Sequence, residues 1–190
     1  MTTALLIIDM QLGSFTPVGP KYDAVGLVDR LNALGDAVRT AGGTVIFVQH
    51  DGPEGDPHHP DLPGWHLLPT LHIREGDLRV HKRSCDAFLH TELDDVLRAG
   101  GIDRLIITGC ATDYCVDSTV RSALARATPT IVPSDGHTTS DRPHLRAQQI
   151  MMHHNAIWAD FIAPGGPATI CSCAQVARMI AEGKSVCTIV

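Results

Sequence analysis

The residue with the clearest capacity for chemistry is Cys115, which stands where an apolar strand gives way to a helix. The strand pattern is Leu105-Ile106-Ile107-Thr108, and the helix pattern continues through Val116, Val120 and Leu124. A thiol at such a junction lies among free backbone N–H groups and near the positive end of the helix dipole, and both favour the thiolate. Since the thiolate is the nucleophilic form of cysteine, the sequence predicts nucleophilic chemistry at this position.

Two further polar residues end strands of the same predicted sheet. Asp9 directly follows Leu5-Leu6-Ile7-Ile8, and Lys82 ends the short run 78–82. Because ligands of open α/β sheets bind beyond the carboxyl ends of the strands, we expect Asp9, Lys82 and Cys115 to meet at one edge. A carboxylate, an ammonium and a thiol placed together can carry covalent catalysis. Taken singly, each has a structural interpretation, as a cap, a solvated charge and a small buried hydrophobe respectively.

Alternating apolar runs and helical patterns must position these residues. Strands are expected at 4–9, 44–49, 78–82, 104–108, 129–133 and 158–162, and helices at 23–41, 91–100, 115–126, 143–155 and 172–180. A strand followed by a helix, repeated five times, implies a parallel sheet covered on both faces. We predict one domain over residues 1–190, of the three-layer α/β/α class, with a mostly parallel, doubly wound sheet of about six strands. No nucleotide-binding glycine motif accompanies this pattern.

Charge and hydropathy exclude several classes of partner. The formal net charge is −6 and no basic stripe is available for nucleic acid. The first apolar segment, residues 4–8, is too short to span a membrane and ends at Asp9. It also lacks the basic leader and cleavage site of a signal peptide, so a cytoplasmic protein is expected. Six cysteines in such a chain are expected to be thiols and not a disulfide framework.

Three motifs occur in order over nearly the whole chain. They are Leu6-Ile7-Ile8-Asp9-Met10-Gln11 with Phe15 close behind, Lys82-Arg83-Ser84-Cys85-Asp86-Ala87-Phe88, and Gly109-Cys110-Ala111-Thr112-Asp113-Tyr114-Cys115-Val116 with Thr119 and Ala123. Together they resemble the motifs of the isochorismatase-like cysteine hydrolases, a family that includes nicotinamidases, N-carbamoyl amidohydrolases and streptothricin hydrolase.

The resemblance implies that Asp9, Lys82 and Cys115 are the catalytic set. It also implies a cis peptide between Cys110 and Ala111, with the backbone N–H groups of Ala111 and Cys115 forming an oxyanion hole. The implied reaction is hydrolysis of an amide, lactam or carbamoyl C–N bond of a small molecule through a thioester, with no cofactor required. Family members are usually homodimers or tetramers, so a homo-oligomer is expected.

The segments that would select the substrate are harder to interpret. Phe15, Trp65 and His137 are predicted to border the pocket, although Trp65 could equally anchor its long loop and His137 could equally cap a turn. The run His137-Thr138-Thr139 with Pro143-His144-Leu145 looks most like the subgroup containing streptothricin hydrolase, which opens a lactam. A negatively charged chain would suit a cationic substrate of this sort.

Other activities remain as alternatives. Nicotinamidases carry an Asp-x-His metal cluster after the second strand, and the corresponding stretch here, Gln49-His50-Asp51-Gly52, lacks it. We therefore predict no metal site, with zinc binding by the His-rich loop that follows as the alternative. True isochorismatases cleave a vinyl ether without relying on this thiol, so Cys115 favours C–N hydrolysis over that activity. A thiol redox protein using Cys110 and Cys115, and a non-catalytic binding protein on the same fold, are the rivals from other classes.

Overall fold

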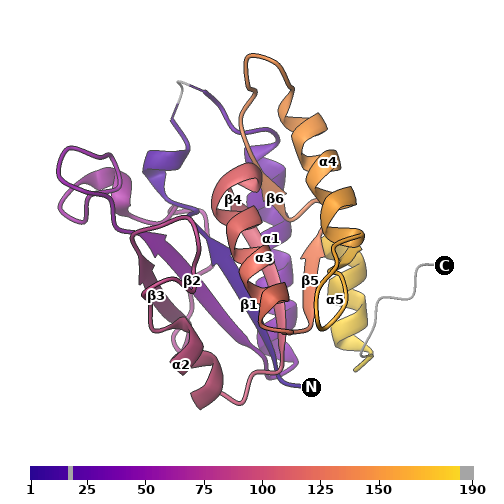
Figure 1. The fold of residues 1–190 in the computed structure, drawn as a ribbon. Coiled ribbons are helices and arrows are strands. Elements are labelled where there is room, and N and C mark those ends of the chain that lie inside the picture. The colour runs from indigo at the N-terminus through magenta and orange to yellow at the C-terminus, as the bar shows by residue number, and fades with distance from the viewer. Residues whose placement is uncertain (17–18, 185–190) are drawn as a thin grey trace.

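A parallel sheet between two layers of helices forms the centre of the molecule (Figure 1). The computed structural model describes residues 1–16 and 19–184. The strands follow the order β3-β2-β1-β4-β5-β7, and the short β6 pairs with β4. All pairings between these strands are parallel, which confirms the predicted α/β fold. The strand bounds are β1 Thr3–Ile8, β2 Thr44–His50, β3 Leu78–Lys82, β4 Arg104–Cys110, β5 Thr130–Pro133, β6 His137–Thr138 and β7 Thr169–Cys171.

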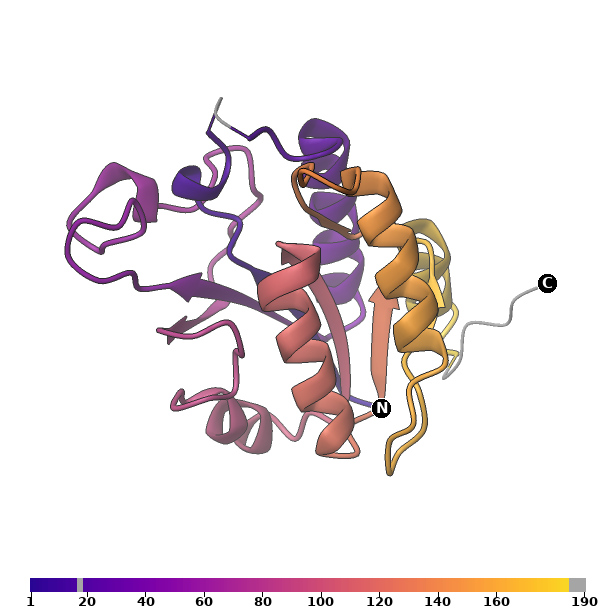
Figure 2. The same ribbon diagram turned by 45° about the horizontal axis from the view of Figure 1, so that its top comes forward.

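The helices divide between the two faces of the sheet (Figures 1 and 2). Helices α1 (Ala24–Thr40) and α5 (Cys173–Ala181) cover one face, and α2 (Leu93–Ala99), α3 (Asp117–Ala125) and α4 (Ala147–Ala159) cover the other. Because side chains alternate along a strand, Leu5 and Ile7 pack on the α1 side while Leu6 and Ile8 pack on the α3 side. The strands are therefore apolar throughout, as expected of a sheet buried on both faces.

The strand order reverses at β1, which places the carboxyl ends of β1 and β4 at the switch point of the sheet. Gly109 pairs with Ile8 across these two strands. Its φ is 116°, and a Cβ at this position would lie 2.2 Å from the Ile8 carbonyl oxygen. Only glycine allows so close an approach with this backbone conformation. Gly109 therefore lets the carboxyl ends of β1 and β4 lie close together.

The strand predicted at 158–162 is wrong, because α4 continues to Ala159. Trp158 is fully buried on this helix, and its indole N–H donates to Asp117 Oδ1 at 2.8 Å. Ile162 is 98% exposed. The strand at this edge is instead the three-residue β7. A short apolar run does not by itself distinguish the end of a helix from a strand.

Two further observations concern the chain as a whole. In the described ranges, no helix combines the length and hydropathy needed to cross a membrane. Cys85, Cys110, Cys115 and Cys173 are thiols outside any disulfide, and Cys187 lies outside the described residues.

Candidate active site

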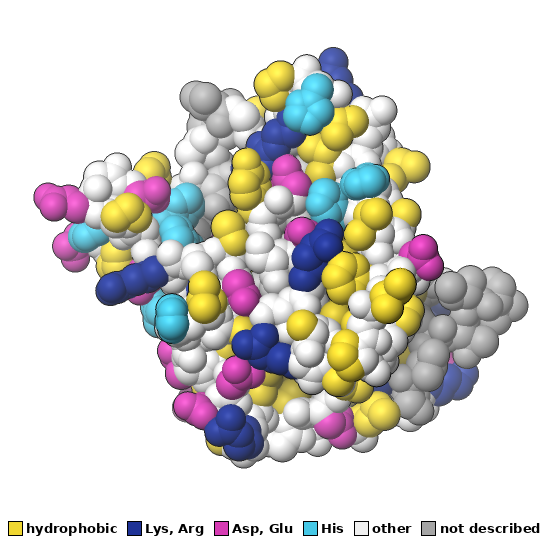
Figure 3. All heavy atoms as spheres, viewed as in Figure 1, with side chains coloured by type: hydrophobic (Ala, Val, Ile, Leu, Met, Phe, Trp, Pro, Cys, Tyr) yellow, Lys and Arg dark blue, Asp and Glu magenta, His cyan; other side chains and the backbone are white. Residues whose placement is uncertain are grey.

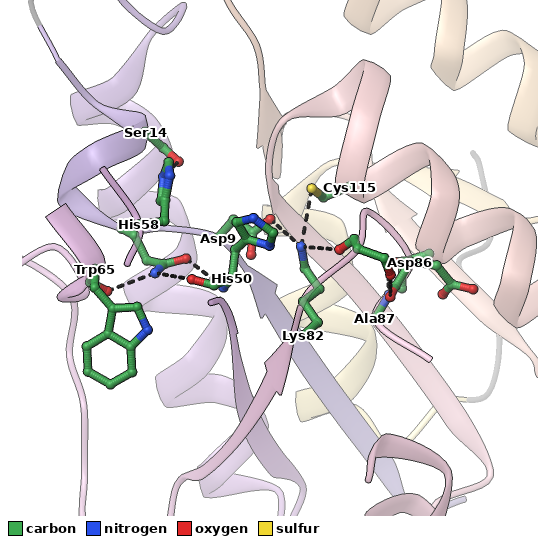
Figure 4. A network of polar contacts seen from close by, with 12 residues as sticks. Asp9, Ser14, His50, His58, Trp65, Lys82, Asp86, Ala87 and Cys115 are labelled. Carbon is green, nitrogen blue, oxygen red and sulfur yellow. Dashed lines mark hydrogen bonds and ion pairs between the residues drawn. The ribbon is translucent and has the colours of Figure 1, made fainter. Parts of the chain in front are cut away.

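The structure brings Asp9, Lys82 and Cys115 into contact at the carboxyl edge of the sheet (Figure 4). The Lys82 ammonium donates to Asp9 Oδ2 at 2.7 Å and to the Cys115 sulfur at 3.3 Å. Asp9 follows β1, Lys82 ends β3 and Cys115 follows β4, so three separate strands supply the cluster. This is the juxtaposition expected from the strand ends.

Lys82 is held as a buried ammonium. Its side chain is inaccessible to solvent, and a third hydrogen bond runs to the Ser84 carbonyl oxygen at 3.0 Å. An ammonium has three N–H donors, so all of them are engaged. Burial alone would lower the pKa of Lys82, but the Asp9 carboxylate and Cys115 outweigh it and the pKa is raised.

Cys115 lies in a π-helical turn, Thr112–Val116, that precedes α3. Burial raises the pKa of the Cys115 thiol and the Asp9 carboxylate raises it further, while Lys82 acts in the opposite direction. This differs from the thiolate expected at a helix start. Burial and a neighbouring carboxylate both destabilise the thiolate. Here their combined effect exceeds the stabilisation that the start of the helix and Lys82 provide.

Asp9 offers an unused hydrogen-bond acceptor beside this thiol. Its backbone has φ 49°, a left-handed conformation in which Asp is among the more common non-glycine residues. Oδ2 accepts from Lys82, whereas Oδ1 is buried and has no hydrogen-bond partner among the described residues. A buried acceptor left unpaired in this way is the kind of exception that accompanies catalytic groups.

The peptide between Cys110 and Ala111 is cis, as the family resemblance implies. Both Ala111 and Cys115 line a pocket of about 330 Å³ that also contains Asp9. This volume suits a small molecule.

The other residues of the pocket wall, which the sequence did not predict there, come from loops, from the ends of β2 and β4 and from the turn that holds Cys115. They are Ser14, Lys21, His50, His58, Arg83, Ser84, Cys85 and Tyr114, together with Cys110. Arg83 adjoins Lys82, and His50 and His58 belong to the His-rich stretch considered for metal binding. Their closeness to these predicted features was the signal in the sequence that they could line the pocket. Tyr114 likewise adjoins Cys115 in the third motif. Lys21 carried no such signal, because its position depends on how the chain between β1 and α1 folds over the sheet.

One wall contains a hydrogen-bonded chain of three side chains, of which Figure 4 shows Ser14 and His58. Ser14 Oγ lies 2.9 Å from His58 Nε2, and His58 Nδ1 lies 3.0 Å from Asp56 Oδ1. The His58 backbone N–H lowers the pKa of Asp56, which keeps it an acceptor for the ring. Burial lowers the pKa of the neighbouring His50. In the described part of the chain, no three His, Cys, Asp or Glu side chains are grouped as metal ligands would be.

Phe15 and Trp65 do not line the pocket that holds Cys115. Phe15 packs against the core on the α1 side. The Trp65 indole N–H donates to Asp51 Oδ1 at 2.7 Å, and its ring stacks on His81 with centroids 5.6 Å apart. These contacts make Trp65 an anchor of its long loop, the alternative to a place in the pocket.

His137 does not line the pocket. It is fully buried, with Nδ1 2.9 Å from Thr112 Oγ1 and Nε2 3.0 Å from Asn155 Oδ1. Its ring also meets the edge of Trp158. Both ring nitrogens are used within the protein, so none remains for a substrate. Burial lowers the pKa of His137 to about 4.

This pKa predicts a pH dependence of folding stability. In the unfolded chain His137 has the ordinary histidine pKa of about 6.5. Between pH 6.5 and about 4 the unfolded state therefore holds more protons than the folded state. Stability is therefore expected to fall as pH drops through this window, by up to about 3 kcal/mol from this residue. Urea unfolding at pH 7 and pH 4.5 measures the slope, and His137→Gln should flatten it. An equal slope in both proteins would contradict the assignment.

Known proteins resemble this chain in sequence and in structure. It is 33% identical to a streptothricin hydrolase of Streptomyces noursei over 140 residues, covering 74% of this chain and 51% of that protein. It is 32% identical to the ureidoacrylate amidohydrolase RutB of Caulobacter vibrioides over 156 residues, covering 63% and 69%. The chain thus spans about half the length of the streptothricin hydrolases it matches.

Solved structures agree with this relationship. One isochorismatase family protein superposes with a TM-score of 0.81 at 32% identity, covering 90% of this chain and 98% of that one. An isochorismatase from Pseudomonas putida gives 0.83 at 28% identity, covering 90% and 88%. The model of the isochorismatase domain matches residues 3–160, and with this match the resemblance seen in the three motifs is confirmed: the chain belongs to the isochorismatase family.

Proposed function

We propose that this protein is a cysteine hydrolase that cleaves a C–N bond of a small amide-type molecule through a thioester on Cys115. The observation that carries the proposal is the buried contact of Lys82 with both Asp9 and Cys115 at the strand ends. A base, a cation and a nucleophile within hydrogen-bond reach are the components that covalent acyl transfer needs.

The reaction begins with a protonated thiol, because the pKa of Cys115 is raised. As the sulfur attacks the carbonyl carbon, the thiol proton passes to Asp9, whose Oδ1 has no competing partner among the described residues. Lys82 keeps its proton and stabilises the negative charge that develops on sulfur. Proton transfer in step with attack is general base catalysis, and it removes the need for a stable thiolate.

The carbonyl oxygen gains negative charge during this attack. In the proposal, the backbone N–H groups of Ala111 and Cys115 donate to it, and both residues line the pocket. Losing one donor of this kind typically costs about 3–4 kcal/mol of transition-state stabilisation.

The remaining steps return the enzyme to its starting state. Asp9 gives its proton to the leaving amine as the C–N bond breaks, which leaves an acyl group on sulfur. Water then attacks the thioester and loses a proton to Asp9, the C–S bond breaks, and that proton returns to Cys115. Atoms and charges balance without a redox partner.

A lactam hydrolase of the streptothricin hydrolase type is the narrower form of the proposal, supported by the similarity to those enzymes. An amidohydrolase acting on a carbamoyl group is supported in the same way by the similarity to RutB. A redox function through Cys110 is disfavoured, since burial raises the pKa of that thiol to about 12.

A turnover screen tests the proposed function. The panel holds simple amides, lactams including streptothricin, N-carbamoyl amines, nicotinamide and isochorismate, and the readout is release of amine or ammonia, or loss of the vinyl ether. We expect C–N cleavage of at least one amide, lactam or carbamoyl compound and none of the vinyl ether. Cleavage of isochorismate alone would replace the proposal with the vinyl ether hydrolase.

A further inference from the structure

Two cations line the Cys115 pocket without a carboxylate to neutralise them. Lys21, just before α1, donates to Ser140 Oγ at 3.0 Å. Arg83 directly follows β3 and is exposed. Within residues 1–16 and 19–184, no carboxylate oxygen lies within 4.0 Å of either charged group. Both side chains are therefore available to a ligand in the pocket.

Three acidic groups around the pocket are already engaged. Asp9 is paired with Lys82, so these two charges cancel. Asp113, next to the pocket residue Tyr114, is paired with Arg142 at 2.8 Å. Asp51, near Arg83, accepts from the Trp65 indole and contacts His81.

A further carboxylate at this wall, Asp56, contacts His58 Nδ1 at 3.0 Å, so it too has a partner within the protein. His50 and His58 can only add positive charge when they bind a proton. The charge of Lys21 also acts on the pocket itself, because it lowers the pKa of Cys110 against the larger effect of burial. Among the described residues, the pocket thus has two cations outside any ion pair, Lys21 and Arg83, in a chain whose net charge is −6.

The charge of the whole surface does not determine the charge that a ligand meets in the pocket. On the face shown in Figure 3, acidic and basic side chains are interspersed, and histidines lie over α4 and on the loop that protrudes at the left. Because interspersed surface charges are screened within about 10 Å at ordinary salt, a ligand near Cys115 responds chiefly to the charges in the pocket.

Resting on the proposed function, we propose that the substrate is an amide or carbamoyl compound that also carries a carboxylate, with Lys21 and Arg83 as its specificity residues. The guanidinium of Arg83 can bind a carboxylate through two parallel N–H donors, and the Lys21 ammonium provides a compact second charge. The carboxylate reaches toward these cations while the scissile carbonyl lies at Cys115. The substrate class is that of N-carbamoyl or N-acyl amino acids and ureido acids, which differs from the cationic substrate suggested by net charge.

Three matched substrates test this inference. An N-carbamoyl amino acid, its neutral primary amide and an N-carbamoyl diamine differ in charge but share the scissile group. Wild type is expected to cleave the acid with kcat/KM at least about 10-fold above the neutral amide, the gain of a charged hydrogen bond. The preference for the acid should shrink as salt rises from about 0.05 to about 0.5 M, because dissolved ions screen the charges of Lys21 and Arg83.

Variants assign the preference to the two side chains. Lys21→Gln and Arg83→Gln should each reduce the acid-to-amide ratio, mainly through KM, and the double variant should bring it close to one. Arg79→Gln is the matched control, because Arg79 is exposed on the same strand as Lys82 but does not line the pocket. It should keep the wild-type ratio.

The outcomes separate this inference from the proposed function. Equal or faster cleavage of the neutral or cationic compound overturns the anionic substrate while supporting the hydrolase. A preference for the acid that survives both glutamine substitutions overturns the role of Lys21 and Arg83. No cleavage of any of the three by wild type overturns the inference, and the hydrolase stands if the turnover screen shows cleavage of a lactam or another amide. Absence of C–N cleavage throughout that screen counts against both.

Discussion

Cys115→Ala is expected to lower kcat/KM by at least about 10⁴-fold, because it removes the atom that forms the covalent bond. In hydrolases of this general kind, losing the nucleophile leaves only the catalysis supplied by binding and the oxyanion hole. The fold should be retained, since the half-buried sulfur contacts Lys82 and is not part of the fully buried core.

Initial rates on whichever substrate the screen identifies give the measurement, with circular dichroism as the check on folding. Cys173→Ala is the matched control, because Cys173 is a buried thiol that packs on the far side of the sheet with α1 and α5. That variant should lose stability, by roughly 1–2 kcal/mol, and keep its turnover. Full activity in Cys115→Ala would exclude the thioester mechanism.

Asp9→Asn is expected to have two opposite effects, a loss of turnover and a gain in thiol reactivity. Turnover should fall by about 10³-fold, the usual contribution of a general base. The Asp9 carboxylate raises the pKa of Cys115, whereas Lys82 lowers it. With the carboxylate gone, burial still raises the pKa of Cys115 but Lys82 opposes it without Asp9. The thiolate fraction should therefore rise, and iodoacetamide should alkylate Cys115 faster at pH 8.

A merely structural Asp9 would not produce this pair of effects. Asp9→Asn leaves the buried Lys82 without its ion-pair partner, so a stability loss of about 3 kcal/mol is expected and alkylation is measured well below the unfolding temperature. Peptide mapping separates Cys115 from the exposed Cys85. Asp51→Asn, a carboxylate one residue beyond β2, should leave the alkylation rate unchanged. Slower alkylation in Asp9→Asn, or retained turnover, would contradict the role of Asp9 as the base.

The parts of the site on regular strands could be predicted from the sequence. Apolar runs located β1, β3 and β4 to within two residues. Asp9 follows β1, Lys82 ends β3, and the turn that holds Cys115 follows β4. Parallel strands align their carboxyl ends, so the topology alone brings these residues to one edge. Their mutual contact therefore follows from periodicity and fold class.

The walls of the pocket could not be predicted, because they belong to loops whose paths depend on tertiary contacts. Lys21 reaches the site through a bridge to Ser140, more than a hundred residues away in sequence. Trp65 is predicted at the pocket because its loop resembles the family's loop before the lysine strand, and His137 because it follows the fifth strand. In the structure, hydrogen bonds to Asp51 and to Asn155 hold these two side chains outside the pocket.

The protonation state of Cys115 shows a second limit. The sequence places the thiol near a helix start and a lysine, which both favour thiolate. Burial and the adjacent carboxylate act in the opposite direction, and burial is the largest contribution. Solvent exposure is a property of the packed molecule, so the sign of the shift required the structure.

The central claim is that turnover passes through an acyl group on Cys115, and partitioning to hydroxylamine tests it most directly. Two substrates with the same acyl group but different leaving amines are hydrolysed in the presence of hydroxylamine, and the ratio of hydroxamate to acid is measured. A common thioester predicts the same ratio for both substrates, since the leaving amine has departed before the two nucleophiles compete. A ratio that changes with the leaving amine would show that water attacks the substrate directly and would contradict the account.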